Sequence, residues 1–209
     1  NNLLEYKNGA DLLFNNNPET ELINANGRNY GVEFFLKKNK GKFTGWVSYS
    51  LSRSEIQVTD DFNNVNNGQF FPSNFDRKHD LSLVGIVEIT PRLFSSLTFN
   101  YNSGRPFTLP QGKYSFEEIQ VPLFEDRNQN RLPAYHRMDL SVKWHTKNFH
   151  SDGSPKKFSD YWTLNIYNLY SRSNVYSYVF EQNEQGETTV TPYSIIDQIV
   201  PSISYHFKF

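Results

Sequence analysis

Residues that could carry out chemistry are spread along this chain without the spacing that catalysis or tight metal binding requires. Residues 126–130 (Asp-Arg-Asn-Gln-Asn) begin like a calcium-binding loop. Such a loop needs a glycine at its sixth position and a bidentate glutamate at its twelfth. Arg131 and Arg137 occupy these positions, so the sequence favours a solvated loop over a calcium site.

The histidines do not suggest a zinc site, because their separations do not match the spacing of zinc ligands. They are His79, His136, His145, His150 and His206. A hydrolase built into a barrel wall would need a serine and a histidine held together with an orienting polar group. Nothing in the sequence selects such a pair. The sequence therefore predicts neither an enzyme nor a protein that holds a metal or another cofactor.

Aromatic and cationic residues in the long polar segments are the better candidates for ligand contact, since they offer stacking and charge. They are Phe70, Phe71, Arg105, Tyr114 and Phe116. A sugar would favour the aromatic rings, whereas a ferric chelate would favour arginine and tyrosine. The same rings could instead pack against one another, and the sequence leaves these alternatives open.

Composition limits the class of protein. The 209 residues include 18 Phe, 13 Tyr and no Cys, with a net charge of −1 and a mean hydropathy of −0.66. The lack of cysteine excludes disulfides and thiolate metal sites. Charge near zero, without a basic cluster interleaved with aromatics, argues against nucleic acid as a partner. No apolar run reaches the roughly 18 residues of a transmembrane helix, but barrel strands that alternate polar and apolar residues also have low mean hydropathy.

Alternating strands must position the polar segments, and the clearest one covers residues 199–209. Apolar residues recur there at every second position and polar ones lie between them, which gives the strand two different faces. A tilted strand of about this length crosses a bilayer. The same alternation predicts strands at 30–38, 43–53, 78–89, 93–101, 134–145, 160–170 and 175–180, with a further one at 3–7.

The predicted connections alternate in length. Tight turns are expected at 39–42 and 90–92, and long polar loops at 8–24, 54–77, 104–132 and 181–192. This asymmetry is typical of outer-membrane barrels. Asn168 breaks the apolar phase of its strand, so a bulge or bend is expected there. Aromatic residues gather near the short turns: Phe43, Trp144, Phe158, Trp162, Phe207 and Phe209.

The fold predicted from these patterns is all-β, an antiparallel transmembrane β-barrel with a polar lumen. Its lumen-facing charged residues would be Glu33, Lys37, Asp80, Glu88, Asp139, Lys143 and Lys208. A soluble β-sandwich that buries its apolar face remains the alternative fold.

A series of short motifs follows in one order along nearly the whole chain. They are NLLEYKNGA (2–10), YGVEF (30–34), GKFTGW (41–46), SYSLS (48–52), FDRKHDLS (75–82), NSGRP (102–106), YHRMDL (135–140) and YNLY (167–170), with a terminal Phe209. In this order they resemble the C-terminal part of TonB-dependent outer-membrane receptors. The match is best to the variety that carries a carboxypeptidase-regulatory-like domain ahead of its plug.

The resemblance implies that residues 1–209 are one C-terminal segment, about seven or eight strands, of a barrel of about 22 strands. It implies import of a ferric chelate, cobalamin, oligosaccharide or peptide across the outer membrane of a Gram-negative cell. The implied partners are outer-membrane lipid, the TonB complex through a region expected upstream, a surface lipoprotein and the barrel-assembly machinery. Residues 76–80 would pair structurally at the rim. Tyr205, Phe207 and Phe209 resemble the signal that the assembly machinery reads.

Two other functions stay open. A complete eight-stranded outer-membrane barrel could act as an adhesin or structural anchor, and a soluble β-sandwich could act as a binding module. Strand number and chain mass would separate an importer from a small barrel, and solubility without detergent would favour the sandwich.

Overall fold

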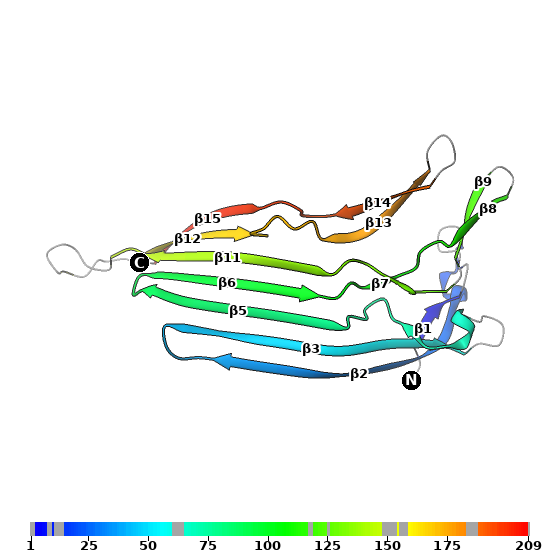
Figure 1. The fold of residues 1–209 in the computed structure, drawn as a ribbon, viewed down its shortest axis with the longest axis horizontal. Helices are drawn as coiled ribbons and strands as arrows, with labels where there is room; N and C mark the ends of the chain where they lie inside the picture. The colour runs from blue at the N-terminus through cyan, green and yellow to red at the C-terminus, as the bar shows by residue number, and fades with distance from the viewer. Residues whose placement is uncertain are drawn as a thin grey trace. The chain divides into compact units, whose positions relative to one another are not determined.

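The computed structural model describes residues 3–7, 10, 15–59, 65–116, 119–124, 126–147, 154, 159–182 and 188–208. Over these residues the chain forms strands and two short 3₁₀ turns, η1 (Pro18–Glu21) and η2 (Val65–Gly68) (Figure 1). None of the helical segments described is long and apolar enough to cross a membrane. The predicted all-β class is confirmed.

The main sheet is a meander in which each strand neighbours the next strand of the same sheet, in the order β1-β2-β3-β5-β6-β11-β12-β15, with β4 beside β3. Its strands are β1 (Leu3–Tyr6), β2 (Leu22–Lys38), β3 (Phe43–Val58), β4 (Phe71–Pro72), β5 (His79–Thr90), β6 (Leu93–Asn102), β11 (Tyr135–His145), β12 (Ser159–Tyr167) and β15 (Val200–Lys208). The predicted strands of the meander are confirmed, including the one at the start of the chain. This order ends at β1 and β15, so among the described residues each of these two pairs on one side only.

Three further two-stranded sheets lie within the long connections. They pair β7 (Pro106–Phe107) with β10 (Asn130–Arg131), β8 (Gly112–Phe116) with β9 (Ile119–Leu123), and β13 (Val175–Gln182) with β14 (Thr188–Ser194). The predicted loops at 104–132 and 181–192 are therefore wrong in part, as is the one at 54–77, where β3 extends to Val58 and β4 is Phe71–Pro72. β13 confirms the strand predicted at 175–180. The strands β7 to β10 are only two to five residues long, too short to show the sustained alternation by which a strand can be recognised.

The connections alternate in length as predicted. Residues 39–42 join β2 to β3 and residues 91–92 join β5 to β6, and the connection from β11 to β12, residues 146–158, is intermediate in length. Longer segments join β3 to β5, β6 to β11 and β12 to β15. The two tight turns lie at one end of their strands (Figure 1), which we call the short-turn end; the opposite one is the long-loop end. This asymmetry is the one expected of an outer-membrane barrel.

The chain divides into two compact units. Unit 1 contains Asn1–Val32, Leu51–Lys78 and Gly104–Leu132, and unit 2 contains Glu33–Ser50, His79–Ser103 and Pro133–Phe209. Unit 1 therefore holds most of the long connections, and unit 2 holds β5, β6, β11, β12 and β15.

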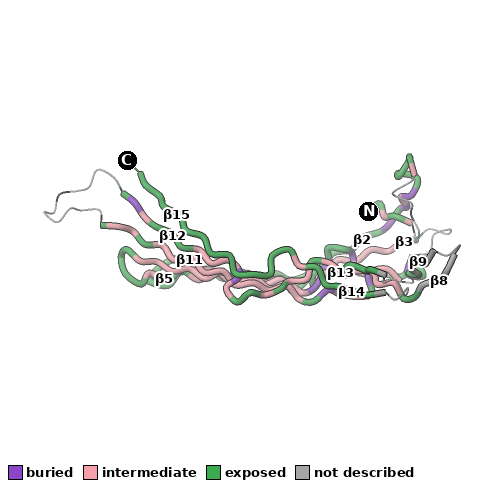
Figure 2. The backbone as a smooth tube through the Cα atoms, turned by 90° about the horizontal axis from the view of Figure 1, so that it is seen from above, coloured by how far each residue is buried: buried purple, intermediate pink, exposed green. Residues whose placement is uncertain are grey.

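Strand register in unit 2 sorts the side chains onto two faces. One aligned row across β6, β11, β12 and β15 is apolar and consists of Leu97, Leu140, Ile166 and Pro201. The adjacent row is polar and consists of Ser96, Ser141, Asn165 and Ser202. Because successive residues of a strand point to opposite faces, the sheet has an apolar face and a polar face. Side chains on both faces are exposed to solvent to some extent, since the residues of β5, β11, β12 and β15 are half-buried or exposed over nearly the whole length of these strands (Figure 2).

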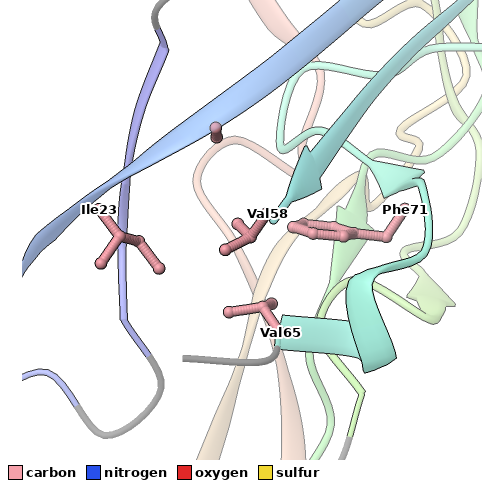
Figure 3. Packing of buried hydrophobic residues seen from close by; sticks show 5 residues of the cluster. Ile23, Val58, Val65 and Phe71 are labelled. Carbon is pink, nitrogen blue, oxygen red and sulfur yellow. The ribbon is translucent and has the colours of Figure 1, made fainter. Parts of the chain in front are cut away.

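Unit 1 contains the buried hydrophobic cluster. Ile23, Ala25, Val58, Val65 and Phe71 pack together there (Figure 3). The sequence predicted a loop up to Asn24, because asparagine and glycine are poor strand formers. That prediction is wrong, since β2 begins at Leu22. Burial of Ile23 and Ala25 against the cluster outweighs the weak local propensity.

Gly45 allows β3 to approach β5 closely. Its φ is +155°, and a Cβ at this position would lie 2.1 Å from the carbonyl oxygen of Val84. A side chain therefore cannot be added without moving one of the two strands.

We expect Gly45→Ala to lower the free energy of unfolding by about 3 kcal/mol, because the added Cβ meets a backbone oxygen. Gly112→Ala is the matched control, since a Cβ there meets nothing within 4 Å. Denaturant unfolding of both variants measures the difference. Equal losses of stability would show that the close approach to Val84 is not what requires glycine.

Candidate functional site

Asp76 organises the long connections of unit 1. Its side chain is fully buried at 0% exposure. The carboxylate accepts a hydrogen bond from the backbone nitrogen of Ser54 at 2.7 Å and one from Arg131, while Nη1 of Arg53 lies 3.6 Å from Oδ2. A buried carboxylate requires such partners, because an uncompensated charge in the interior is costly. We call these four residues the Asp76 hub.

Arg131 extends the hub to the start of the longest connection. Its Nη1 donates to the carbonyl oxygen of Gly104 at 3.0 Å and to that of Asp76 at 3.3 Å. The structural role predicted for residues 76–80 is confirmed for Asp76. It is also confirmed for His79, which bonds Tyr49 at 2.8 Å, and for Asp80, which accepts from Asn102 at 2.6 Å.

Two buried asparagines with left-handed backbone conformation hold the segment 126–131 in place through hydrogen bonds. Asn128, at φ +60°, donates to the carbonyl oxygen of Pro72 at 2.8 Å and to Oδ1 of Asn74 at 2.9 Å. Asn66, at φ +50°, exchanges hydrogen bonds of 2.8 and 2.7 Å with the backbone of Arg127. The interpretation of this segment as a solvated loop is therefore wrong for Asn128, whose polar groups are satisfied by the chain itself.

The predicted ligand contacts Phe70 and Phe71 have different environments. Phe71 is 1% exposed within the hydrophobic cluster, so its side chain has almost no surface for a ligand. Phe70 is partly exposed, and the guanidinium of Arg28 lies 3.8 Å from its ring centroid. Arg28 in turn pairs with Glu55 at 2.8 Å. Sequence reasoning missed this arginine, because nothing local indicates that strand residue 28 meets residue 70.

The other predicted ligand residues lie elsewhere in unit 1. Arg105 is partly exposed, and its carbonyl oxygen accepts from the backbone nitrogen of Leu132 at 3.0 Å. Tyr114 is 52% exposed on β8, where it pairs in register with Val121. Phe116 ends the same strand. The structure thus places Phe71 in β4 of the main sheet, with Phe70 directly before it, and Tyr114 and Phe116 on a separate hairpin.

The polar face of unit 2 carries a second charged group at the long-loop end. Arg137 bonds Asp139 at 2.9 Å and donates to the hydroxyl oxygens of Tyr135 at 2.9 Å and Tyr167 at 2.6 Å. The guanidinium also lies 4.1 Å from the Tyr167 ring centroid. Asp139 was predicted to face the lumen, but its arginine partner two residues away was not recognised.

Aromatic rings line up at the short-turn end of unit 2. On the apolar face Trp162 contacts Tyr205 at 4.7 Å between ring centroids, and Tyr205 contacts Phe207 at 5.9 Å. On the polar face Tyr161 stacks on His206 at 4.6 Å. The sequence predicted aromatics at this end, and Trp144, Trp162 and Phe207 confirm it. Phe158 and Phe209 lie outside the described residues.

The apolar face of unit 2 is exposed. Ile203 is 68% and Phe207 59% exposed, and the other exposed apolar side chains on these strands include Val87, Ile89, Trp144, Trp162, Leu164 and Tyr205. Isolated apolar residues on a surface are ordinary, but a contiguous set marks a surface that meets a membrane or a partner. With a polar face opposite, the sheet has the two-sided character of a transmembrane barrel wall.

A comparison with protein families decides between the remaining interpretations. The family model described as TonB dependent receptor-like, beta-barrel matches residues 3–169. The chain belongs to the TonB-dependent receptor β-barrel family. No curated protein and no solved structure gives a match. The family predicted from the order of the motifs is confirmed.

Membership explains the two faces of this receptor barrel. TonB-dependent receptors are outer-membrane β-barrels that act as transporters and not as enzymes. The strand-rich sheet agrees with that class. Tyr205 and Phe207 lie on β15 as predicted for an assembly signal, Phe209 lies outside the described residues, and the signal itself stays a prediction.

We expect Asp76→Asn to loosen the long connections of the receptor barrel, because Arg131 and Arg53 lose their buried carboxylate. A cost of about 3 kcal/mol for local opening corresponds to protease cleavage of residues 104–132 that is faster by about a hundredfold. Glu19→Gln removes one exposed carboxylate and is the control. Unchanged cleavage in Asp76→Asn would contradict the role assigned to the hub.

Proposed function

We propose that this receptor barrel imports a scarce nutrient across the outer membrane of a Gram-negative cell, using energy delivered by the TonB complex. The candidate nutrients are a ferric chelate, cobalamin, an oligosaccharide or a peptide. The observation that carries the proposal is the exposed apolar face of unit 2 with its polar face opposite. A water-soluble sandwich would cover that apolar face, whereas a barrel wall directs it to lipid.

The open edges of β1 and β15 support a larger barrel. Within the described part of the chain each of these strands pairs on one side only. Unpaired backbone groups cost several kcal/mol each in lipid, so barrels close completely. We propose that residues 1–209 are one segment of the barrel wall and that other strands close it. An eight-stranded adhesin or anchor would instead pair β1 with β15.

The long-loop end is the proposed ligand side. Short turns of outer-membrane barrels face the periplasm and long loops face outward. There the Asp76 hub and the buried asparagines hold the long connections in place, so a ligand would meet a preorganised surface. Tyr114 and Arg105, with Phe70 and Phe116, are the proposed contacts. Outer-membrane lipid, the barrel-assembly machinery, a surface lipoprotein and TonB, reached through an N-terminal region, are the proposed partners.

Arginine scanning tests which face meets lipid. We expect Leu140→Arg to destabilise the barrel by about 2–4 kcal/mol, because it places a charge in hydrocarbon. Ser141→Arg, one residue along β11 and on the polar face, should cost much less. Urea unfolding of the full-length receptor in bilayers measures both. Equal penalties would mean that the two faces have been assigned wrongly.

Uptake tests the transport itself. Cells that express the full-length receptor are given labelled ferric chelates, cobalamin, oligosaccharides and peptides, with and without TonB. We expect one class to accumulate, and only when TonB is present. Uptake that does not depend on TonB would overturn the proposal.

With that nutrient in hand, Tyr114→Ala should weaken its binding to the purified receptor by about tenfold. Phe43→Ala is the matched control, because Phe43 has the same 52% exposure and lies at the short-turn end. Equal affinities for the two variants would remove Tyr114 from the ligand surface while leaving transport intact.

A further inference from the structure

A tightly held turn follows β12 at the long-loop end of unit 2. Asn168 is fully buried at φ +54°, and its backbone nitrogen donates to Oδ1 of Asp139 at 2.9 Å. The bend predicted at this position is confirmed. The side-chain amide of Asn168 bonds both backbone groups of Arg172: it accepts from the backbone nitrogen at 2.9 Å and donates to the carbonyl oxygen at 3.1 Å. Ser171, at φ +55°, donates through its hydroxyl to the Asp197 carbonyl oxygen at 3.2 Å.

This turn presents an arginine whose side chain is partly buried without a partner among the residues described. Nε of Arg172 is buried without a hydrogen-bond acceptor, and it is the one such side-chain atom in the described part of the chain. Arg172 also forms no ion pair with any described residue. Arg137, by contrast, is bonded to Asp139 and two tyrosines. Buried polar groups in folded proteins are almost always bonded, so an exception requires an explanation.

Two further polar groups lie beside Arg172. The hydroxyl of Tyr170 is 2.7 Å from Nδ1 of His136, and Asn174 holds the His136 backbone with two hydrogen bonds of 3.0 Å. Burial raises the pKa of the Tyr170 phenol, and the nearby charge of Arg172 acts in the opposite direction. The phenol therefore keeps its proton at neutral pH and remains a donor.

Strand register places His136, the strand residue of this cluster, on the apolar face. His136 is the second residue of β11, aligned with Tyr101 of β6, which is aligned with Leu81 of β5. Residues two apart share a face, so His136 lies on the side of Met138 and Leu140. The Tyr170 hydroxyl reaches His136 on that side. The cluster thus lies where the apolar face ends toward the long loops, which is the level of lipid headgroups in the outer leaflet.

We propose that Arg172, together with Tyr170 and His136, binds a phosphate group of an outer-leaflet lipid. This rests on the proposed membrane location of the apolar face. A guanidinium presents a planar fork of donors that matches phosphate oxygens, and it is favoured over lysine where such bidentate recognition matters. Tyrosine beside it is typical of the interface between hydrocarbon and headgroups. The bound phosphate would accept hydrogen bonds from the terminal Nη groups of Arg172, which bond no described residue of the chain and, unlike Nε, are not buried.

Lipid binding to the purified full-length receptor tests the proposal. The receptor is purified in dodecyl maltoside, a detergent without phosphate, lipid A is added, and bound lipid A is counted by native mass spectrometry. We expect Arg172→Gln to reduce retention by about tenfold or more. Arg172→Lys, which keeps the charge but loses the fork, should lie between. Arg92→Gln removes an exposed cation from the short-turn end and should retain lipid A normally.

Further arms separate the sources of phosphate and the causes of failure. Lipid A stripped of its phosphates should bind wild type and Arg172→Gln equally. Strong competition by inorganic phosphate would show a site for free phosphate and overturn the lipid assignment, as would equal retention of intact lipid A by wild type and Arg172→Gln. Heat-modifiable migration of each variant confirms that the barrel has folded. A receptor that is not found in the outer membrane would refute the proposed function, whereas normal localisation with unchanged retention refutes only the lipid site.

Discussion

Backbone amide and carbonyl groups within a bilayer have no water to bond, so every strand of a membrane barrel must be paired along its length. The meander satisfies this constraint because each strand pairs with the next strand of the same sheet. Register then determines which solvent each side chain meets, and a slip of one residue would turn a whole strand to the wrong face. Gly45 allows the close approach of β3 to Val84, and Asn168 directly follows the last residue of β12.

Outside the sheet, side-chain amides and a buried carboxylate make the hydrogen bonds to backbone groups that a neighbouring strand would otherwise make. Asn66, Asn128 and Asn168 each adopt the left-handed conformation that asparagine tolerates, and each bonds backbone groups of a distant or turning segment. Asp76 does the same for Ser54 while forming ion pairs with two arginines. The long connections are thereby ordered by polar contacts, since unit 1 has only a small apolar cluster.

Most of the sheet could be predicted from the sequence, because alternation over ten residues or so is a strong local signal; β11 and β15 lie within a residue or two of their expected bounds. The start of β2 could not, since Ile23 and Ala25 become strand residues only through contact with Val58. The polar segments were the least predictable. Nothing near Asn128 in the sequence indicates that Pro72 and Asn74 will bury it, and Phe71 has the same residue type as Phe70 but a different environment.

The contacts of Arg127 also bear on the order in which the protein folds. It meets Glu5 across 122 residues and Asn66 across 61, whereas Leu140 pairs with Leu97 across 43 residues and with Ile166 across 26. Joining segments so far apart costs more chain entropy, and the contact stabilises only after both segments are held. We therefore expect hairpins to pair first and the long connections to lock last, so that pulse-labelled hydrogen exchange protects Leu140 before Arg127. The surface proposed to contact a ligand would then become ordered only after the strands of the sheet have paired.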